Sequence, residues 1–171
     1  QGLLTVIASW NSFLWPLILS SSQRTYTLSV GLLGGGGGMS NGATLQLSFY
    51  YRDVAGTRRT VAASTITNSE ALFPSRNRFT GFEVRTPIVQ ATDPWAGKHI
   101  GIELASTVGF ELQGGYWDID NARLTANAVP NGSFELPETV FADPRLEGWR
   151  KSPEPAWYQG GNGFPWEQLT G

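Results

Sequence analysis

The 171-residue sequence contains no cysteine and a single histidine, His99. The lack of cysteine excludes disulfide bonds, thiolate zinc sites and cysteine nucleophiles. The presence of only one histidine excludes a metal site built from several histidines. Charged residues make up only 15% of the chain, below the usual share in globular proteins. The 12 basic residues are outnumbered by 14 acidic ones, and this balance argues against nucleic-acid binding, which needs a basic surface.

Apolar and turn-forming residues are abundant instead. Hydrophobic residues account for 40% of the chain, and there are 21 glycines and 10 prolines. This length and composition allow one packed domain and part of another. The chain begins at Gln1 without a start methionine and ends at Gly171 without a natural stop pattern, so we interpret it as a processed chain or a fragment.

Residues 2–20 form an uncharged apolar stretch that allows three interpretations. Its length is near that of a transmembrane helix. Polar residues and Pro16 interrupt it, which favours buried strands of a β-sandwich or an exposed arm that docks on another subunit. Because no basic segment precedes it, it is not an intact signal peptide.

From residue 43 onward the hydrophobic pattern has a period of two, which is typical of half-buried strands. Strands are expected within 43–53, 57–67, 78–89, 98–106 and 116–126. The glycine run 34–38 predicts a flexible loop or linker. No amphipathic helix is evident, so the sequence predicts an all-β fold, an antiparallel β-sandwich or jelly roll, with an irregular C-terminal tail rich in proline and tryptophan.

The inward-facing set changes parity within the last predicted strand. Trp117 and Ile119 share one parity and Ala122 has the other, which predicts a β-bulge at Asp120–Asn121. The oxygen donors gathered around it are Asp118, Asp120 and Asn121. Oxygen donors suit a hard cation such as Ca²⁺, although polar residues on the solvent side of a strand would look the same.

Exposed aromatic side chains are the candidates for sugar binding, which uses an aromatic platform with polar neighbours. The candidates are Tyr50, Trp95, Tyr116, Trp157 and Trp166. Trp95, in the turn "DPWAG", is placed best for an exposed loop tip. Each of these residues has packing in the core as its alternative role.

Three segments, "TYTLSVGL", "GKHIGIELAS" and "GYWDIDNARLT", together resemble the galactose-binding-like jelly rolls of secreted or surface-anchored bacterial proteins of the planctomycete type. Residues 130–135, "PNGSFE", resemble the opening strand of such a domain, with Trp149 downstream. The resemblance implies an N-terminal arm or strand at 1–24, one jelly roll at 25–126 and the start of a second at 127–171.

This resemblance also implies a structural Ca²⁺ that joins an acidic residue of the first strand to an aspartate of the last. In this sequence the pair is Glu135 and Asp120, with Asp118 as a further ligand. Here, however, the strand 131–136 follows the last strand. It has to fold back onto its own domain, or it has to complete the sheet of a neighbouring subunit.

A second, shorter resemblance covers residues 8–32, "ASWNSFLWPLILSSSQRTYTLSVGL". This segment is similar to one near the C-terminus of the permease subunits of bacterial sugar ABC transporters. The coupling loop and the other spans of such a permease are absent, so no transport function follows.

Together these features predict a non-enzymatic extracellular or cell-surface β-sandwich that acts in surface assembly or adhesion. Self-association is expected through residues 2–20 and 131–171, which would be exposed apolar surfaces on a monomer. A carbohydrate-binding module with structural calcium and a fragment of a sugar permease are the alternatives, and membrane contact is left open. Glu83, Glu103 and Glu111 have no spacing that pairs them for glycoside hydrolysis, so no enzyme is predicted.

Overall fold

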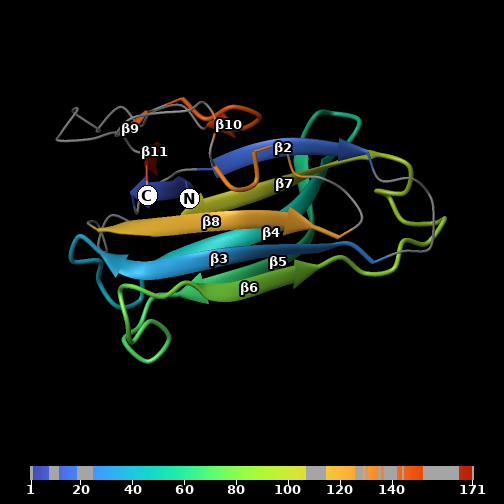
Figure 1. Cartoon of the computed structure of the whole chain (residues 1–171). Helices are drawn as coiled ribbons and strands as arrows, with labels where there is room; N and C mark the ends of the chain where they lie inside the picture. Colours follow the sequence, from blue (N-terminus) through green and yellow to red (C-terminus); the bar gives the residue numbers. More distant parts are fainter. Residues whose placement is uncertain are drawn as a thin grey trace.

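The computed structural model shows a β-sandwich (Figure 1). It describes residues 2–7, 12–18, 25–106, 115–125, 129, 131–134, 136, 142–143, 145–151 and 166–170. Within these ranges every regular element is a strand and every strand pair is antiparallel. The predicted all-β sandwich is therefore confirmed.

Sheet A contains the strands β6–β3–β8–β1–β11–β9, in this spatial order. Their bounds are Thr80–Arg85 for β6, Thr27–Gly36 for β3, Tyr116–Leu124 for β8, Gly2–Ile7 for β1, Trp166–Thr170 for β11 and Ala142–Asp143 for β9. The first and last described strands of the chain, β1 and β11, pair with each other, so the two ends of the chain meet in this sheet.

Sheet B contains the strands β10–β2–β7–β4–β5. Their bounds are Arg150–Lys151 for β10, Ser12–Ile18 for β2, His99–Ser106 for β7, Thr44–Arg52 for β4 and Arg58–Thr67 for β5. The structure thus has strands in the apolar N-terminal stretch, one in each sheet. No helix in the described part of the chain is long and apolar enough to cross a membrane.

The core between the sheets follows the period of two in the sequence. On β4, Leu45, Leu47 and Phe49 are fully buried, and on β7 so are Ile100 and Ile102. A half-buried strand is expected to expose the residues that point away from the core. On β4, however, Ser48 and Tyr50 point away from this core and are also buried. Part of the outer face of sheet B is therefore covered by side chains, and this covered part carries the candidate site.

The β-bulge predicted at Asp120–Asn121 is confirmed. The pairing of β3 with β8 shifts register between Ser29 and Gly31, because β8 has one extra residue there. Asn121 has a φ of 59°, a conformation that asparagine tolerates better than most residues. After the bulge Ala122 faces the core, as its parity requires.

The predicted strand 131–136 is wrong, because its described residues form a turn on their own chain. Asn131 and Phe134 have φ values of 47° and 57°, which an extended strand does not allow. The carbonyl of Gly132 accepts a 2.6 Å hydrogen bond from the N–H of Ala122, at the bulge. Phe134 is fully buried beside Trp149, with ring centroids 5.4 Å apart.

The glycine run is only partly a loop. Gly36 and the two residues before it end β3, and the turn follows at Gly37 and Gly38. The ring of Tyr116 fills the space beside Gly36 where a side chain would stand. The glycines therefore allow a close approach between β3 and the start of β8, and the expectation of a free linker is corrected. The three-part division of the chain stays a prediction.

Candidate functional site

The predicted calcium ligands do not converge on one point among the described residues. Asp118 and Asp120 lie on β8, opposite Leu33 and Gly31 of β3. The side-chain oxygen of Asn121 accepts a 2.7 Å hydrogen bond from Arg123, which occupies one of its acceptor positions. No group of three metal-ligating side chains forms within the described ranges, and Glu135 lies outside them. The calcium site stays a prediction.

The predicted aromatic platforms occupy different environments. Trp95 is 7% exposed and packs in the core, so it does not form an exposed loop tip. Tyr116 is 37% exposed and covers the glycines at the end of β3. Trp157 lies outside the described residues, and Trp166 lies in β11 with a side chain outside the described part. Tyr50 is the platform candidate that lies on a sheet face.

Tyr50 covers the outer face of sheet B because its cross-strand neighbour is a glycine. Tyr50 of β4 pairs with Gly101 of β7. A Cβ at position 101 would overlap the Tyr50 ring. The ring therefore lies across the glycine backbone, and the two residues form a flat floor on the surface of the sheet.

Two charged contacts surround this floor. The Arg58 guanidinium lies over the Tyr50 ring, 5.4 Å from its centroid, and forms an ion pair with Glu103. The Lys98 ammonium lies 5.0 Å from the ring centroid of the adjacent Tyr51. Cations over aromatic faces are attracted by the ring electrons. The first contact holds the Arg58 charge over the floor, whereas the second holds the Lys98 charge against Tyr51, whose ring packs with the core on the other face of β4.

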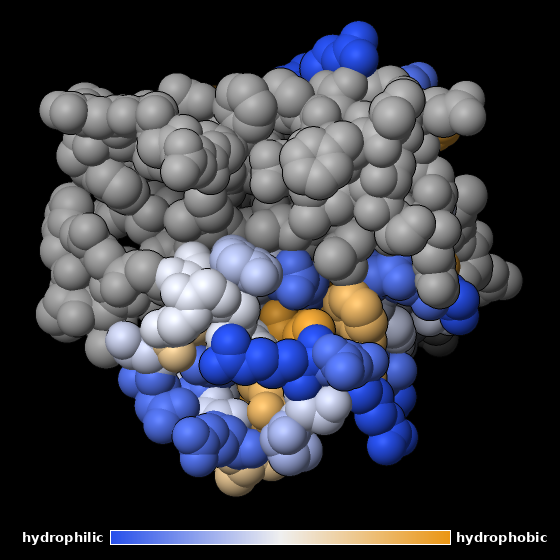
Figure 2. All heavy atoms as spheres, turned by 60° about the vertical axis from the view of Figure 1, so that its left-hand side comes forward, coloured by the Kyte–Doolittle hydropathy of each residue, from blue (hydrophilic) through white to orange (hydrophobic). Residues whose placement is uncertain are grey.

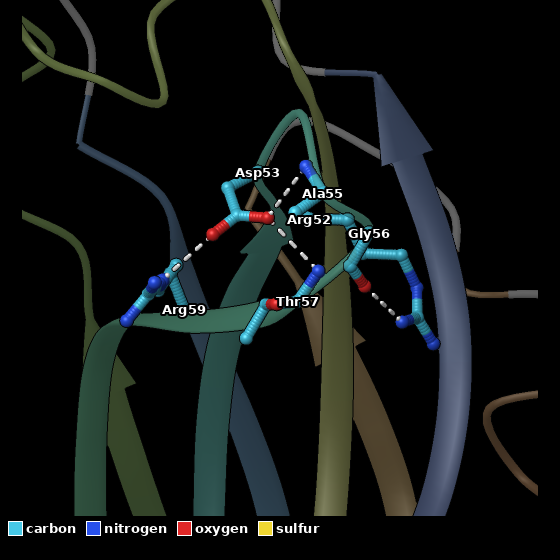
Figure 3. Close-up of polar contacts among 6 residues, drawn as sticks. All are labelled: Arg52, Asp53, Ala55, Gly56, Thr57 and Arg59. Carbon is cyan, nitrogen blue, oxygen red and sulfur yellow. Dashed lines mark hydrogen bonds and ion pairs between the residues drawn. The ribbon is translucent and has the colours of Figure 1, made fainter.

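The turn between β4 and β5 holds Arg52 at the edge of the floor and pairs Asp53 with Arg59 (Figure 3). The Asp53 carboxylate accepts hydrogen bonds from the backbone N–H groups of Ala55 and Thr57 and from the Arg59 side chain, at 2.9–3.0 Å. The hydrogen bond from Arg59 is the main reason why the pKa of Asp53 is lowered. Arg52 leaves the other side of the turn and donates a 2.7 Å hydrogen bond to the carbonyl of Gly56.

Beside the floor is a pocket of about 400 Å³. Its lining residues are Tyr50, Arg52, Gly97, Lys98, His99, Ile100 and Gly101. Burial raises the pKa of the Tyr50 phenol, and the arginines nearby oppose this rise. The described lining therefore contains a phenol, two basic side chains and a histidine, and it contains no carboxylate. We call it the Tyr50 pocket.

Sequence reasoning found only part of this pocket. It identified Tyr50 as an aromatic candidate and predicted a strand within 98–106. It missed the role of the arginines, which come from both sides of a hairpin turn. The available signal was the positive charge at both ends of "RDVAGTR", since hairpin strands bring their ends together.

No protein-family model and no curated protein sequence matches the chain. Solved structures with a similar arrangement include cyclases from Fischerella sp. TAU. A Stig cyclase, Fisc, in complex with (3Z)-3-(1-methyl-2-pyrrolidinylidene)-3H-indole is 25% identical over 63% of this chain and 50% of its own, with a TM-score of 0.45. A second cyclase structure is 25% identical over 70% of this chain and 57% of its own, with a TM-score of 0.48.

A third cyclase structure, in complex with 4-(1H-indol-3-yl)butan-2-one, is 28% identical over 63% of this chain, with a TM-score of 0.44. It too is matched over only half of its length. Because every TM-score is below 0.5, no residue role, ligand or activity is transferred from these proteins to the present chain.

These matches do correct two predictions. The similar structures are enzymes, so a non-enzymatic protein of surface assembly or adhesion is contradicted, as is the prediction that the chain is no enzyme. The carbohydrate-binding module and the permease fragment have no counterpart among them. The galactose-binding-like resemblance, the extracellular location, self-association, and contact with carbohydrate or membrane stay predictions.

Proposed function

We propose that the chain binds a small organic anion, a carboxylate on a planar apolar body, in the Tyr50 pocket. One observation carries the proposal: a flat aromatic floor lies beside Arg52 and Lys98, and no carboxylate is among the described lining residues. Ligand sites usually combine apolar walls with a few placed polar groups, and this pocket has that composition.

The floor suits a planar group. The Tyr50 ring lies over the backbone of Gly101, so no side chain of β7 stands between His99 and Glu103 of that strand. A flat ligand can stack there and remove apolar surface from water, with a gain of roughly 25 cal/mol for each Å² buried.

The cations suit a carboxylate. The Arg52 guanidinium uses one N–H group on Gly56 and keeps others for a ligand. Lys98 also lines the pocket, with its ammonium over the ring of Tyr51 beside it. The Arg58 charge is already shared with Glu103, so we assign the carboxylate to Arg52 and Lys98.

Calorimetric titration with benzoate tests the proposal, with benzamide as the neutral probe of the same shape. We expect benzoate to bind about tenfold more tightly than benzamide, a difference of ~1.4 kcal/mol. The advantage should shrink at high salt, because exposed charges are screened. Equal affinity for the two probes would contradict the proposal.

Matched variants locate the binding. Arg52→Gln and Lys98→Gln should each weaken benzoate binding several-fold. Arg85→Gln removes an exposed arginine from an ion pair on β6 of the other sheet, so it should leave binding unchanged. If Arg85→Gln weakened binding as much as the other two variants, the effect would come from net charge and the pocket assignment would fail.

A further inference from the structure

A second pocket lies at the opposite end of β4, about 550 Å³ in volume. It is bounded by the end of β3 at Gly34 and Gly35, by Asn68 just after β5, and by the connection from β5 to β6, which includes Phe73 and Arg76. Figure 2 shows the end of the sandwich where β3 terminates, with a small apolar area surrounded by hydrophilic residues.

Asn68 contributes a buried acceptor without a partner. Its residue is 3% exposed, and its side-chain nitrogen donates to the carbonyls of Ser40 and Met39, at 3.0 and 3.4 Å. These two bonds fix the orientation of the amide, because only the nitrogen can donate to carbonyl oxygens. The Oδ1 atom has no hydrogen-bond partner within the described structure. Most buried acceptors in proteins do have a hydrogen-bond partner.

The glycines at the end of β3 keep this oxygen uncovered by a side chain. A Cβ at Gly34 would stand 2.7 Å from Asn68 Oδ1 and 2.9 Å from the Phe73 ring, so the position accepts no larger residue without movement. Gly35 has a φ of +81°, which also favours glycine. A strip of bare backbone therefore forms this wall of the pocket.

Gly35 also brings an acceptor and a cation to one point. A Cβ atom at Gly35 would lie 3.9 Å from Asn68 Oδ1 and 4.0 Å from Arg76 Nη2. A small molecule in the pocket beside Gly35 therefore has an acceptor and a guanidinium near it. Glu70 adds a negative charge to the lining. Neither Glu70 nor Arg76 takes part in an ion pair between described residues.

We propose that this Asn68 pocket binds a small zwitterion with the chemistry of a free α-amino acid. The carboxylate binds Arg76, a side chain suited to paired contacts with carboxylate oxygens. The ammonium is attracted by Glu70 and lies toward the unsatisfied Oδ1 atom of Asn68. This site is separate from the Tyr50 pocket and does not depend on the function proposed for it.

Amide NMR titration of the whole chain with L-alanine tests this proposal. The probes with one charge each are acetate and methylamine. We expect L-alanine to shift the backbone amides of Gly34 and Gly35 and the side-chain amide of Asn68, with an affinity about tenfold above that of either single-charge probe. If L-alanine binds no better than acetate, or shifts only amides remote from these three residues, the proposal is overturned.

Variants of exposed lining residues avoid the risk that an altered Asn68 fails to fold. Arg76→Gln and Glu70→Gln should each weaken L-alanine binding several-fold, whereas Arg78→Gln, two residues along the same connection, should not. Lys98→Gln in the Tyr50 pocket should also leave L-alanine binding unchanged. Unaltered binding in Arg76→Gln would overturn the assignment of the carboxylate to that residue.

Discussion

Tyr50 of β4 and Gly101 of β7 are direct cross-strand neighbours, and the tyrosine ring occupies the space that a side chain at position 101 would need. This relationship leaves Tyr50 only 9% exposed although it points away from the core between the sheets. It also produces the flat floor of the Tyr50 pocket.

Gly101→Ala should displace the Tyr50 ring and destabilise the chain by about 1–3 kcal/mol, the usual cost of forcing an extra carbon into a packed site. Gly81→Ala is the matched control, because a Cβ at Gly81 on β6 meets nothing within 4 Å. Urea unfolding of both variants gives the comparison. If Gly101→Ala is as stable as Gly81→Ala, the ring does not lie over the glycine.

Asp53 should stabilise the hairpin turn in two separable ways. Asp53→Asn keeps an oxygen that can accept from Ala55 and Thr57 but loses the charge that faces Arg59. Asp53→Ala loses both. Thermal unfolding at neutral pH should therefore show the lower melting temperature for Asp53→Ala. Equal melting temperatures for the two variants would show that the turn hydrogen bonds contribute nothing.

The lowered pKa of Asp53 fixes the direction of its pH effect. A carboxyl group with a lower pKa in the folded state stabilises above its unfolded pKa, and this contribution disappears as the pH falls through the folded value. The stability difference between the wild type and Asp53→Asn should thus shrink on acidification. A difference that grows at low pH would contradict the ion pair with Arg59.

Tyr50 should ionise at higher pH than an exposed tyrosine, because burial raises its pKa above the ordinary value of 10.0. The stability associated with its neutral form is fully present below that value and is lost as the pH rises through the folded pKa. Ultraviolet absorbance titration of the wild type minus Tyr50→Phe isolates this phenol. A difference curve with its midpoint at or below 10.0 would refute its burial against Gly101.

Phe134→Ala should destabilise the chain by about 3–5 kcal/mol, the usual cost of removing a buried phenylalanine ring. Phe134 is fully buried beside Trp149. Phe79→Ala, at a residue that is 37% exposed, is the control and should cost much less. Equal costs in urea unfolding would mean that the segment around Phe134 does not pack on its own chain.

Strands β4 to β8 and the bulge could be predicted from the sequence because both depend on local alternation. Leu45, Leu47 and Phe49 face the core as their spacing requires, and Ala122 changes parity at the bulge. The segment around Phe134 could not be predicted in the same way. Its apolar pattern resembles a strand, but Asn131 and Phe134 have positive φ values, and the turn is bonded through the Asn131 side chain to Leu136 and Glu147 and through Gly132 to the distant residue Ala122.

The candidate sites show the same division between local and distant causes. The sequence suggested Tyr50 by its type, and it suggested Trp95 with the same argument, yet Trp95 packs in the core. The sequence did not suggest a ligand-binding role for Asn68 or the glycines of β3, because no local pattern indicates a pocket built from the ends of β3 and β5.

The sequence by itself determined the all-β class and five of the eleven described strands, β4 to β8, since alternation of apolar residues acts between immediate neighbours in the chain. Only the tertiary structure decided that Tyr50 meets Gly101, that Arg76 and Asn68 flank Gly35, and that residues 131–134 return to β8. These relationships depend on strand register and on chain return over long separations, which local preference does not specify.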